Sequence, residues 1–313
     1  PLTWKFSLGN PDHVLTRCLP LAKLLASRAM AILWLLVVGY GVLQAGNHWS
    51  QLTQGQLHKI LAPGNLLLLW FTYPLLKVVH EFGHGLFTKV WGGHVNEWGV
   101  VVILGTPLPY VDASASIAFV HKRQRLMVGA AGIAVELFVA AVALLLWLQV
   151  QDGLLRDFLY NLILIGGVST LLFNGNPLMR YDGYHLLTEA LDLPNLGARA
   201  NQQLHYWVRR FGYGEKNLLM PAASRKEAAV FTLYALSASV DRMVMLFGIV
   251  WVLGKFSPQL ALLLALWMLC FQMLLPVATY VQSLATNPKW QANRKRALTL
   301  VAASSVIVVL GLV

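Results

Sequence analysis

Charged residues and cysteines are scarce in this chain of 313 residues. Only 12% of the residues are charged, whereas 57% are hydrophobic. A composition this apolar excludes an ordinary soluble domain and predicts a polytopic membrane protein. The two cysteines, Cys18 and Cys270, lie far apart in or near apolar stretches. Their spacing indicates neither a metal-binding pair nor a disulfide framework.

Long apolar runs predict an all-α polytopic membrane protein with about six or seven transmembrane helices, because roughly 20 apolar residues are needed to cross a bilayer. A short β-branched segment at 97–104, bounded by glycine and proline, predicts a strand or re-entrant segment associated with the membrane. The apolar runs cover 29–45, 66–90, 126–150, 158–173, 230–253, 260–284 and 297–313.

The basic residues are unevenly distributed between the predicted loops. The net charge of +11 could indicate nucleic-acid binding, but 18 of the 24 lysines and arginines fall in alternate loops and only three in the others. This asymmetry follows the positive-inside rule of membrane proteins, so we expect a lipid bilayer and no nucleic acid as a partner. It predicts a cytoplasmic N-terminus and places the later half of the run 66–90 towards the cytoplasm.

The chain begins without methionine and ends inside an apolar run. No cleavable signal peptide is evident, because the first apolar run is long and lacks a clear small-residue cleavage site. Seven spans from a cytoplasmic start would leave the C-terminus outside. We therefore expect a fragment of a longer protein whose extracytoplasmic region follows the last span.

The strongest chemical signal is the sequence His80-Glu81-Phe82-Gly83-His84. Two histidines four residues apart project from one face of a helix, so both can bind one zinc ion, and Glu81 is placed to act on a zinc-bound water. The pattern alone would arise by chance in about one chain in a hundred. Inside an apolar run such residues are costly and predict a functional site; the alternative is a polar contact between helices.

A tetrahedral zinc site needs a further side chain and a water. The best candidate is Asp182, in the polar segment after the fourth apolar run, because the predicted topology returns this segment to the depth of the histidines. Its carboxylate would offset part of the zinc charge. Pro177 ends the preceding helix, and Gly183 permits a close backbone approach. The alternative for Asp182 is a helix cap or a turn residue.

Further charges lie inside predicted spans, including Lys77, Glu136, Asp241 and Arg242. Lys77 precedes Glu81 by one turn, so we expect it to pair with Glu81 or to extend towards the membrane surface. Glu136 lies in the third span, where intramembrane charge indicates either function or a contact between helices. Loop histidines such as His94, His121 and His185 are expected to be solvated rather than metal ligands.

The combined motifs resemble those of the site-2 protease family of intramembrane zinc metalloproteases. The resemblance rests on two motifs: His-Glu-x-x-His and, nearly a hundred residues later, Asn-Pro-x-x-x-x-Asp-Gly, which begins at Asn176. The resemblance implies one zinc ion per chain, held by His80, His84 and Asp182. It implies Glu81 as the general base and Asn176 as a residue that helps to hold the substrate peptide. A turn-forming role for Asn176 is nearly as well supported.

The resemblance covers about 66–190, and the segment 97–104 is similar to the β segment that pairs with substrate in such proteases. The extra spans, the Tyr-Val-Asp turn at 110–112 and the Arg-Tyr-Asp-Gly-Tyr sequence resemble a bacterial branch of peptide zinc metalloproteases. That branch is often joined to a periplasmic adaptor domain of secretion systems. It implies a multi-pass protein of the bacterial inner membrane, with its active site towards the cytoplasm.

These predictions divide the chain into an N-terminal segment with the first span (1–65), a catalytic core (66–190), a basic cytoplasmic loop (191–226) and C-terminal spans (227–313). The predicted function is intramembrane hydrolysis of a membrane-anchored or hydrophobic peptide. The alternative is a membrane component of a peptide secretion or efflux system, whose zinc site is structural or vestigial. The resemblance also implies a periplasmic adaptor domain or secretion partner as a candidate partner.

Overall fold

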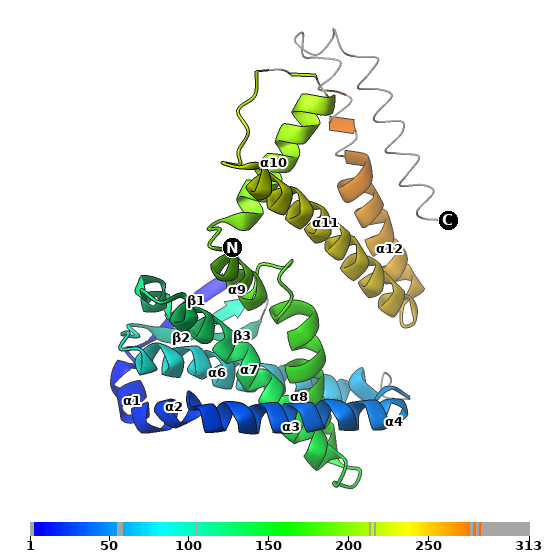
Figure 1. The fold of residues 1–313 in the computed structure, drawn as a ribbon. Helices are drawn as coiled ribbons and strands as arrows, with labels where there is room; N and C mark the ends of the chain where they lie inside the picture. The colour runs from blue at the N-terminus through cyan, green and yellow to red at the C-terminus, as the bar shows by residue number, and fades with distance from the viewer. Residues whose placement is uncertain are drawn as a thin grey trace. The chain divides into compact units, whose positions relative to one another are not determined.

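The structure is a computed structural model that describes residues 3–54, 59–103, 105–212, 214–215, 217–275, 278–279 and 282. It is mostly helical and contains a small three-stranded sheet, which confirms the predicted helical class and the presence of a β segment (Figure 1). The chain divides into two compact units, Pro1–Leu193 and Pro194–Val313. The predicted catalytic core lies within the first unit.

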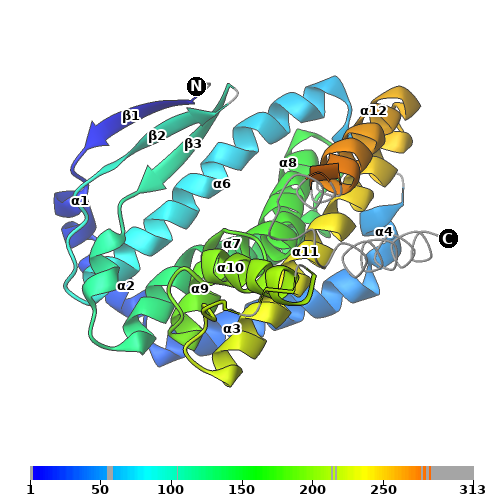
Figure 2. The same ribbon diagram turned by 90° about the horizontal axis from the view of Figure 1, so that it is seen from above.

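Helix α7 is the centre of the first unit, because it packs against α3, α6, α8, α9 and the π-helical segment η2. Figure 2 shows α6 running between the sheet and helices α7 and α8. The helical elements are α1 (Asp12–Arg17), α2 (Leu19–Leu25), α3 (Arg28–Asn47), α4 (Trp49–Thr53), α6 (Pro63–Val90), η1 (Ser114–Ala118), α7 (Lys122–Trp147), α8 (Leu154–Ile163), η2 (Leu164–Asn174) and α9 (Asp182–Leu191).

Four helices among the described residues are long and apolar enough to cross a membrane. They are Arg28–Asn47, Lys122–Trp147, Leu154–Asn174 and Arg225–Gly254, which correspond to the first, third, fourth and fifth predicted spans. The prediction of six or seven spans is thus confirmed for four.

The other predicted spans differ from this set for separate reasons. Helix α6 is 28 residues long but carries three charged residues and two histidines, which lower its mean hydropathy. The sixth predicted span, 260–284, corresponds in part to a shorter apolar helix, Pro258–Gln272. The seventh, at 297–313, lies outside the described residues.

The sheet has three antiparallel strands in the order β1 (Thr3–Gly9), β2 (Trp98–Ile103) and β3 (Thr106–Val111). Strand β2 confirms the predicted β segment at 97–104 over Trp98–Ile103; Glu97 precedes the strand, and Leu104 lies outside the described residues. Because β1 and β3 occupy both edges of β2, this strand has no free edge for a substrate peptide. The expectation that β2 itself pairs with substrate is therefore wrong.

Asp12 links α1, near the start of the first unit, to the last turn of α6. Its carboxylate accepts hydrogen bonds from Lys89 Nζ at 2.9 and 3.0 Å and from Val95 N at 2.9 Å. The hydrogen bonds from Lys89 are the largest cause that lowers the pKa of Asp12, to about 2. Beneath this contact, Leu15, Ala22, Leu86 and Val95 form a buried cluster.

This ion pair predicts a specific pH dependence of stability. A carboxyl group with a lowered folded-state pKa stabilises the fold above its unfolded pKa, and the contribution is lost as the pH falls from about 4 to about 2. We expect Asp12→Asn to reduce the free energy of unfolding by about 2 kcal/mol at neutral pH.

Unfolding of detergent-solubilised protein across this pH range measures the difference. Asp152→Asn is the matched control, because Asp152 pairs with Arg156 while 81% of its side chain is exposed. A difference between wild type and Asp12→Asn that stays constant down to pH 2 contradicts the assignment.

The second unit contains α10 (Leu196–Trp207), the π-helical segment η3 (Val208–Gly212), α11 (Arg225–Gly254), α12 (Pro258–Met268) and the π-helical segment η4 (Leu269–Leu274). Helix α11 packs against both α10 and α12. Its first turn is capped by Ser224, whose hydroxyl accepts a hydrogen bond from Glu227 N. Arg199 of α10 forms an ion pair with Glu227, which ties the two helices together.

Candidate metal centre

Helix α6 presents His80 and His84 one turn apart, as the spacing in the sequence predicts. Their Nε2 atoms lie 3.1 Å from each other, and the ring centroids are 4.8 Å apart. Only 4% of the His80 surface is exposed, and His84 is largely buried as well. Two ring nitrogens therefore converge on one point within the protein.

Asp182 completes this group from the first turn of α9. Its Oδ2 atom lies 3.0 Å from His80 Nε2 and 3.3 Å from His84 Nε2. The ligand atoms of the three residues all lie within 4.8 Å of one another, and no other such group occurs in the part of the chain that the structure describes. The prediction that Asp182 comes close to the two histidines is confirmed.

The loop before α9 is built to place this carboxylate. Helix η2 ends at Asn174, whose Nδ2 donates a hydrogen bond of 3.1 Å to Asp182 Oδ2. Gly183 lies directly against the backbone of Gly175, where a Cβ would approach the carbonyl oxygen to less than 3.0 Å. The predicted close backbone approach at Gly183 is confirmed. The sequence analysis did not identify Asn174, although its position directly after the fourth apolar run was a usable signal.

The hydrogen-bond partners of the two rings make the convergence suitable for a cation. His84 Nδ1 lies 2.7 Å from the carbonyl oxygen of Val128. A carbonyl only accepts, so Nδ1 carries the hydrogen and Nε2 of the neutral ring presents a lone pair. On the other ring, His80 Nδ1 lies 3.3 Å from Glu136 Oε1, although without good hydrogen-bond alignment. Two lone pairs and a carboxylate oxygen thus share one space, which fits a metal ion.

Gly132 of α7 provides the room for this arrangement. A Cβ at Gly132 would lie less than 3.0 Å from ring atoms of both His80 and His84. The neighbouring Gly83 of α6 lies against the backbone of Ala131, with 3.3 Å between the ideal Cβ position and the carbonyl oxygen. The α6–α7 contact is therefore close at the level of His80 and His84.

Glu81 lies between the two histidines in sequence, and its carboxylate is oriented by the sheet. Glu81 Oε2 accepts a hydrogen bond of 3.0 Å from Val111 N, at the end of β3. This contact explains why a strand packs against α6 here: the backbone of β3 fixes the carboxylate that the sequence analysis assigned as general base.

Glu136 is fully buried and joins three helical segments. Its Oε1 atom lies 2.6 Å from Lys77 Nζ of α6, and its Oε2 accepts a 2.6 Å hydrogen bond from Thr170 of η2. Lys77 thus pairs with Glu136 rather than with Glu81, which corrects the sequence-based expectation. The reason is that α7 brings a carboxylate to the same depth. This network contacts His80 on its Nδ1 side, whereas Asp182 lies on its Nε2 side.

The position of Glu136 predicts a loss of metal affinity in Glu136→Gln. A carboxylate behind a metal-bound histidine orients the ring and increases its basicity, and loss of such a partner costs about 10–100-fold in affinity. Competition with a chromophoric zinc chelator measures this value, and the Co²⁺ absorption spectrum reports the ligand geometry. Glu189→Gln, which also breaks an ion pair beside α7, is the control. Equal zinc affinity in Glu136→Gln and wild type would exclude the supporting role.

Asn176 is engaged within its own turn. Its Oδ1 accepts a hydrogen bond of 2.9 Å from Leu178 N, and its Nδ2 donates to the carbonyl oxygen of Leu172 at 3.3 Å. These contacts match the turn-forming alternative, and binding of substrate by Asn176 stays a prediction. His94 is solvated as expected, with 76% of its side chain exposed.

The centre thus combines two imidazole nitrogens, a carboxylate oxygen and an adjacent glutamate in one buried place. Histidine and aspartate are ligands that zinc accepts, and three protein ligands leave a fourth tetrahedral position for water or substrate, as in catalytic zinc sites. A structural site would more often use four protein ligands. Comparisons with family models, with curated proteins and with solved structures find no match to this chain.

Proposed function

We propose that this protein is an intramembrane zinc metalloprotease that hydrolyses a peptide bond of a membrane-embedded or hydrophobic peptide. The observation that carries the proposal is the meeting of His80 Nε2, His84 Nε2 and Asp182 Oδ2, with Glu81 on the same helix. This set occurs beside helices that are apolar enough to span a membrane. Buried polar groups of this kind have a functional reason when they lie at membrane depth.

The charges around the centre favour a divalent ion. Asp182, Glu81 and Glu136 bring three carboxylates, and Lys77 brings one ammonium group, so the formal charge of these four groups is −2. Burying a net charge in a medium of low dielectric constant is costly. A divalent cation neutralises the group. The combination of two imidazoles and one carboxylate suits zinc better than magnesium or calcium, which prefer oxygen ligands.

In the proposed reaction, zinc supplies Lewis-acid polarisation of the scissile carbonyl and activation of water. Glu81 accepts a proton from the attacking water as the C–O bond forms, and returns it to the leaving amine as the C–N bond breaks. The hydrogen bond from Val111 N keeps the Glu81 carboxylate in one orientation during both transfers. Asp182 and the two histidines stay in place as ligands.

Strand β3 is the edge at which we propose that substrate binds. The N–H of Val111 donates a hydrogen bond to Glu81, whereas the N–H of Asp112 donates to the carbonyl oxygen of Glu97. The backbone N–H and C=O groups of odd-numbered residues of β3 therefore face away from β2. The other two odd-numbered residues, Pro107 and Pro109, have no N–H. This edge therefore accepts hydrogen bonds but does not donate them. An extended substrate can donate its N–H groups to β3 while its own carbonyls stay available for hydrolysis.

An apolar cavity of about 610 Å³ includes residues adjacent in sequence to His84 and Gly132, and it supports a hydrophobic substrate. It lies between α3, α6 and α7, and it is lined by Gly83 and Ala131, next to Gly132. Its surface is formed almost entirely by apolar side chains. A helical substrate segment must unwind before cleavage, because a helix occupies its carbonyls in its own hydrogen bonds. We therefore expect cleavage near helix-destabilising residues.

The membrane arrangement is part of the same proposal. Helix α6 joins the four apolar helices as a further span, because its polar residues face the centre and its length is sufficient. The distribution of lysine and arginine favours a cytoplasmic N-terminus and an active site towards the cytoplasm in a bacterial inner membrane. With the remaining apolar runs, the chain has six or seven spans. An adaptor domain or secretion partner outside the membrane fits this topology.

The test is zinc content and peptide cleavage by the purified full chain. We expect one zinc ion per chain, cleavage of membrane-anchored peptides, and loss of both on treatment with a chelator. Asp182→Ala should lose zinc, whereas Asp192→Ala, which removes a carboxylate paired with Lys122, should retain it. Absence of zinc from every preparation refutes the metal centre. Stoichiometric zinc without cleavage across a broad peptide panel favours the alternative, a secretion component with a structural site.

A further inference from the structure

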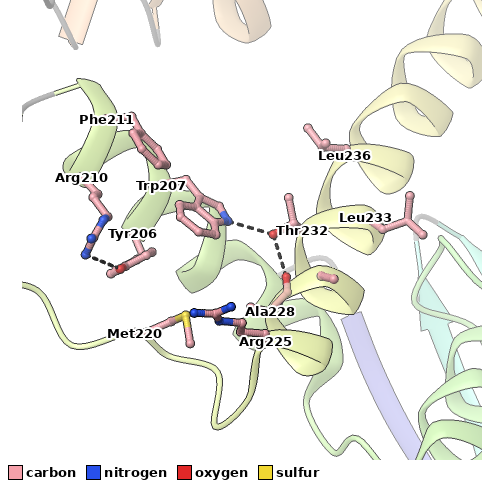
Figure 3. A pocket seen from close by; sticks show the side chains of 11 residues that line it. Tyr206, Trp207, Arg210, Phe211, Met220, Arg225, Ala228, Thr232, Leu233 and Leu236 are labelled. Atoms are coloured by element: carbon pink, nitrogen blue, oxygen red, sulfur yellow. Dashed lines mark hydrogen bonds between the residues drawn. The ribbon is translucent and has the colours of Figure 1, made fainter.

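A second cavity, of about 790 Å³, lies entirely within the second unit, between α10, η3 and the first turns of α11. Aromatic side chains form one wall. Trp207 stacks on Phe211 with 5.3 Å between the ring centroids, and its Nε1 donates a hydrogen bond of 2.9 Å to Thr232 Oγ1. Tyr206 packs edge-on against Trp207. The indole ring is thus fixed in place by contacts on two sides (Figure 3).

The cavity has a cationic end and an apolar end. Figure 3 shows Arg210 at the left beside Tyr206 and Arg225 at the lower centre beside Met220, with Leu233 and Leu236 of α11 at the right. Arg210 donates one hydrogen bond, of 2.9 Å, to the Tyr206 hydroxyl and lies over that ring. A ligand that fills the cavity would therefore meet two guanidinium groups and an apolar helix face.

The two arginines lack carboxylate partners among the described residues, unlike others of the same unit. Arg199 pairs with Glu227, and Arg209, adjacent to Arg210, pairs with Glu215 at 2.6 Å. Glu227 lies only two positions after Arg225, but its carboxylate accepts from Arg199 and from Ala223 N. Among the described residues, neither pocket arginine has a carboxylate within ion-pair distance, so two unpaired guanidinium groups line the cavity.

The place of the cavity along α11 suggests the ligand. Arg225 is the first residue of a helix that is long and apolar enough to cross a membrane. Tryptophan and tyrosine gather at the membrane–water interface, and basic pockets beside membrane helices bind anionic lipid headgroups. Guanidinium groups recognise phosphate oxygens by bidentate hydrogen bonds. The apolar residues of α11 continue from the cationic end in the direction that an acyl chain would take.

We propose that this cavity binds the phosphodiester headgroup of an anionic phospholipid through Arg210 and Arg225. The aromatic wall covers the glycerol region, and Leu233 and Leu236 contact an acyl chain. The proposal does not depend on the metal centre, because every residue of the cavity belongs to the second unit. The ligand chemistry is a phosphate ester, so free phosphate and lipid have to be separated by experiment.

The experiment measures lipid retained by the full chain in native mass spectrometry, with phosphatidylglycerol and phosphatidylcholine offered together in mixed detergent micelles. We expect preferential retention of phosphatidylglycerol. The double variant Arg210→Gln, Arg225→Gln should weaken it about 10–30-fold, since each arginine near an anionic lipid surface contributes on the order of a fivefold preference. Arg209→Gln is the matched control, because its guanidinium is already paired with Glu215. It should bind phosphatidylglycerol as wild type does.

Two further measurements on the wild-type protein test the lipid assignment even if the double variant does not fold. Inorganic phosphate and glycerophosphoglycerol, which lacks acyl chains, should displace phosphatidylglycerol poorly, whereas added salt should weaken the preference by screening. Efficient displacement by inorganic phosphate would identify a free anion as the ligand and overturn the lipid assignment. Equal retention of the two lipids, or an equal loss in Arg209→Gln, would overturn it as well.

Discussion

Replacement of Glu81 by glutamine is expected to abolish peptide hydrolysis while zinc stays bound. Glutamine cannot accept the proton of the attacking water, and a positioned general base contributes about 10²–10⁴-fold to the rate of such reactions. The amide oxygen still accepts the hydrogen bond from Val111 N, so the contact between α6 and β3 is preserved. Glu81 is not one of the three converging ligands, so the metal affinity should change little.

Cleavage of a membrane-anchored peptide and zinc content, measured on the same preparation, test this expectation. Glu97→Gln is the matched control, because Glu97 is also bound to the sheet, through Tyr110 and Lys5, but is not one of the converging residues. The control should cleave at the wild-type rate. If Glu81→Gln retains more than about one tenth of the wild-type rate, Glu81 is not the general base. If it loses zinc, Glu81 supports the metal instead.

The convergence of His80, His84 and Asp182 was predictable because each residue is marked by local sequence. His80 and His84 are four residues apart in an apolar run, and the predicted helix over 66–90 ends at the same residue as α6. Asp182 follows a proline-terminated helix and precedes a glycine. These signals depend on helical periodicity and turn chemistry, which act over a few residues. The apolar runs were equally local, which is why four spans agree with long helices.

The supporting residues were not predictable because their roles arise from contacts across the fold. Glu136 was visible as a charge in a span, but its pairing with Lys77 depends on how α6 and α7 meet. Strand β1 alternates polar and apolar residues from Thr3 to Leu8, a usable strand signal that the sequence analysis did not use, whereas β3 contains two prolines and showed no such signal. The assignment of substrate pairing to β2 failed for the same reason: the sequence does not reveal which strands become edges.

Gly132→Ala is expected to disrupt the metal centre, although it adds a single methyl group. The new Cβ would lie less than 3.0 Å from ring atoms of both His80 and His84, so at least one ring must move. The close backbone contact at Gly83 and Ala131 leaves the two helices little freedom to separate. Because first ligands are displaced, zinc affinity should fall by more than the roughly 100-fold that loss of a supporting residue can cause. Peptide cleavage should be lost with it.

Gly129→Ala is the matched control for this change. It lies one turn earlier on the same helix, where a Cβ would come within 3.2 Å of the end of the Leu186 side chain, which can adjust. In both variants alanine favours the helix over glycine by about 1 kcal/mol, so a general loss of helix stability cannot explain a difference between them. Zinc titration and thermal unfolding of both proteins separate the effects. If Gly132→Ala binds zinc as tightly as Gly129→Ala, α7 does not pack behind the histidines, and the proposed arrangement of ligands is wrong.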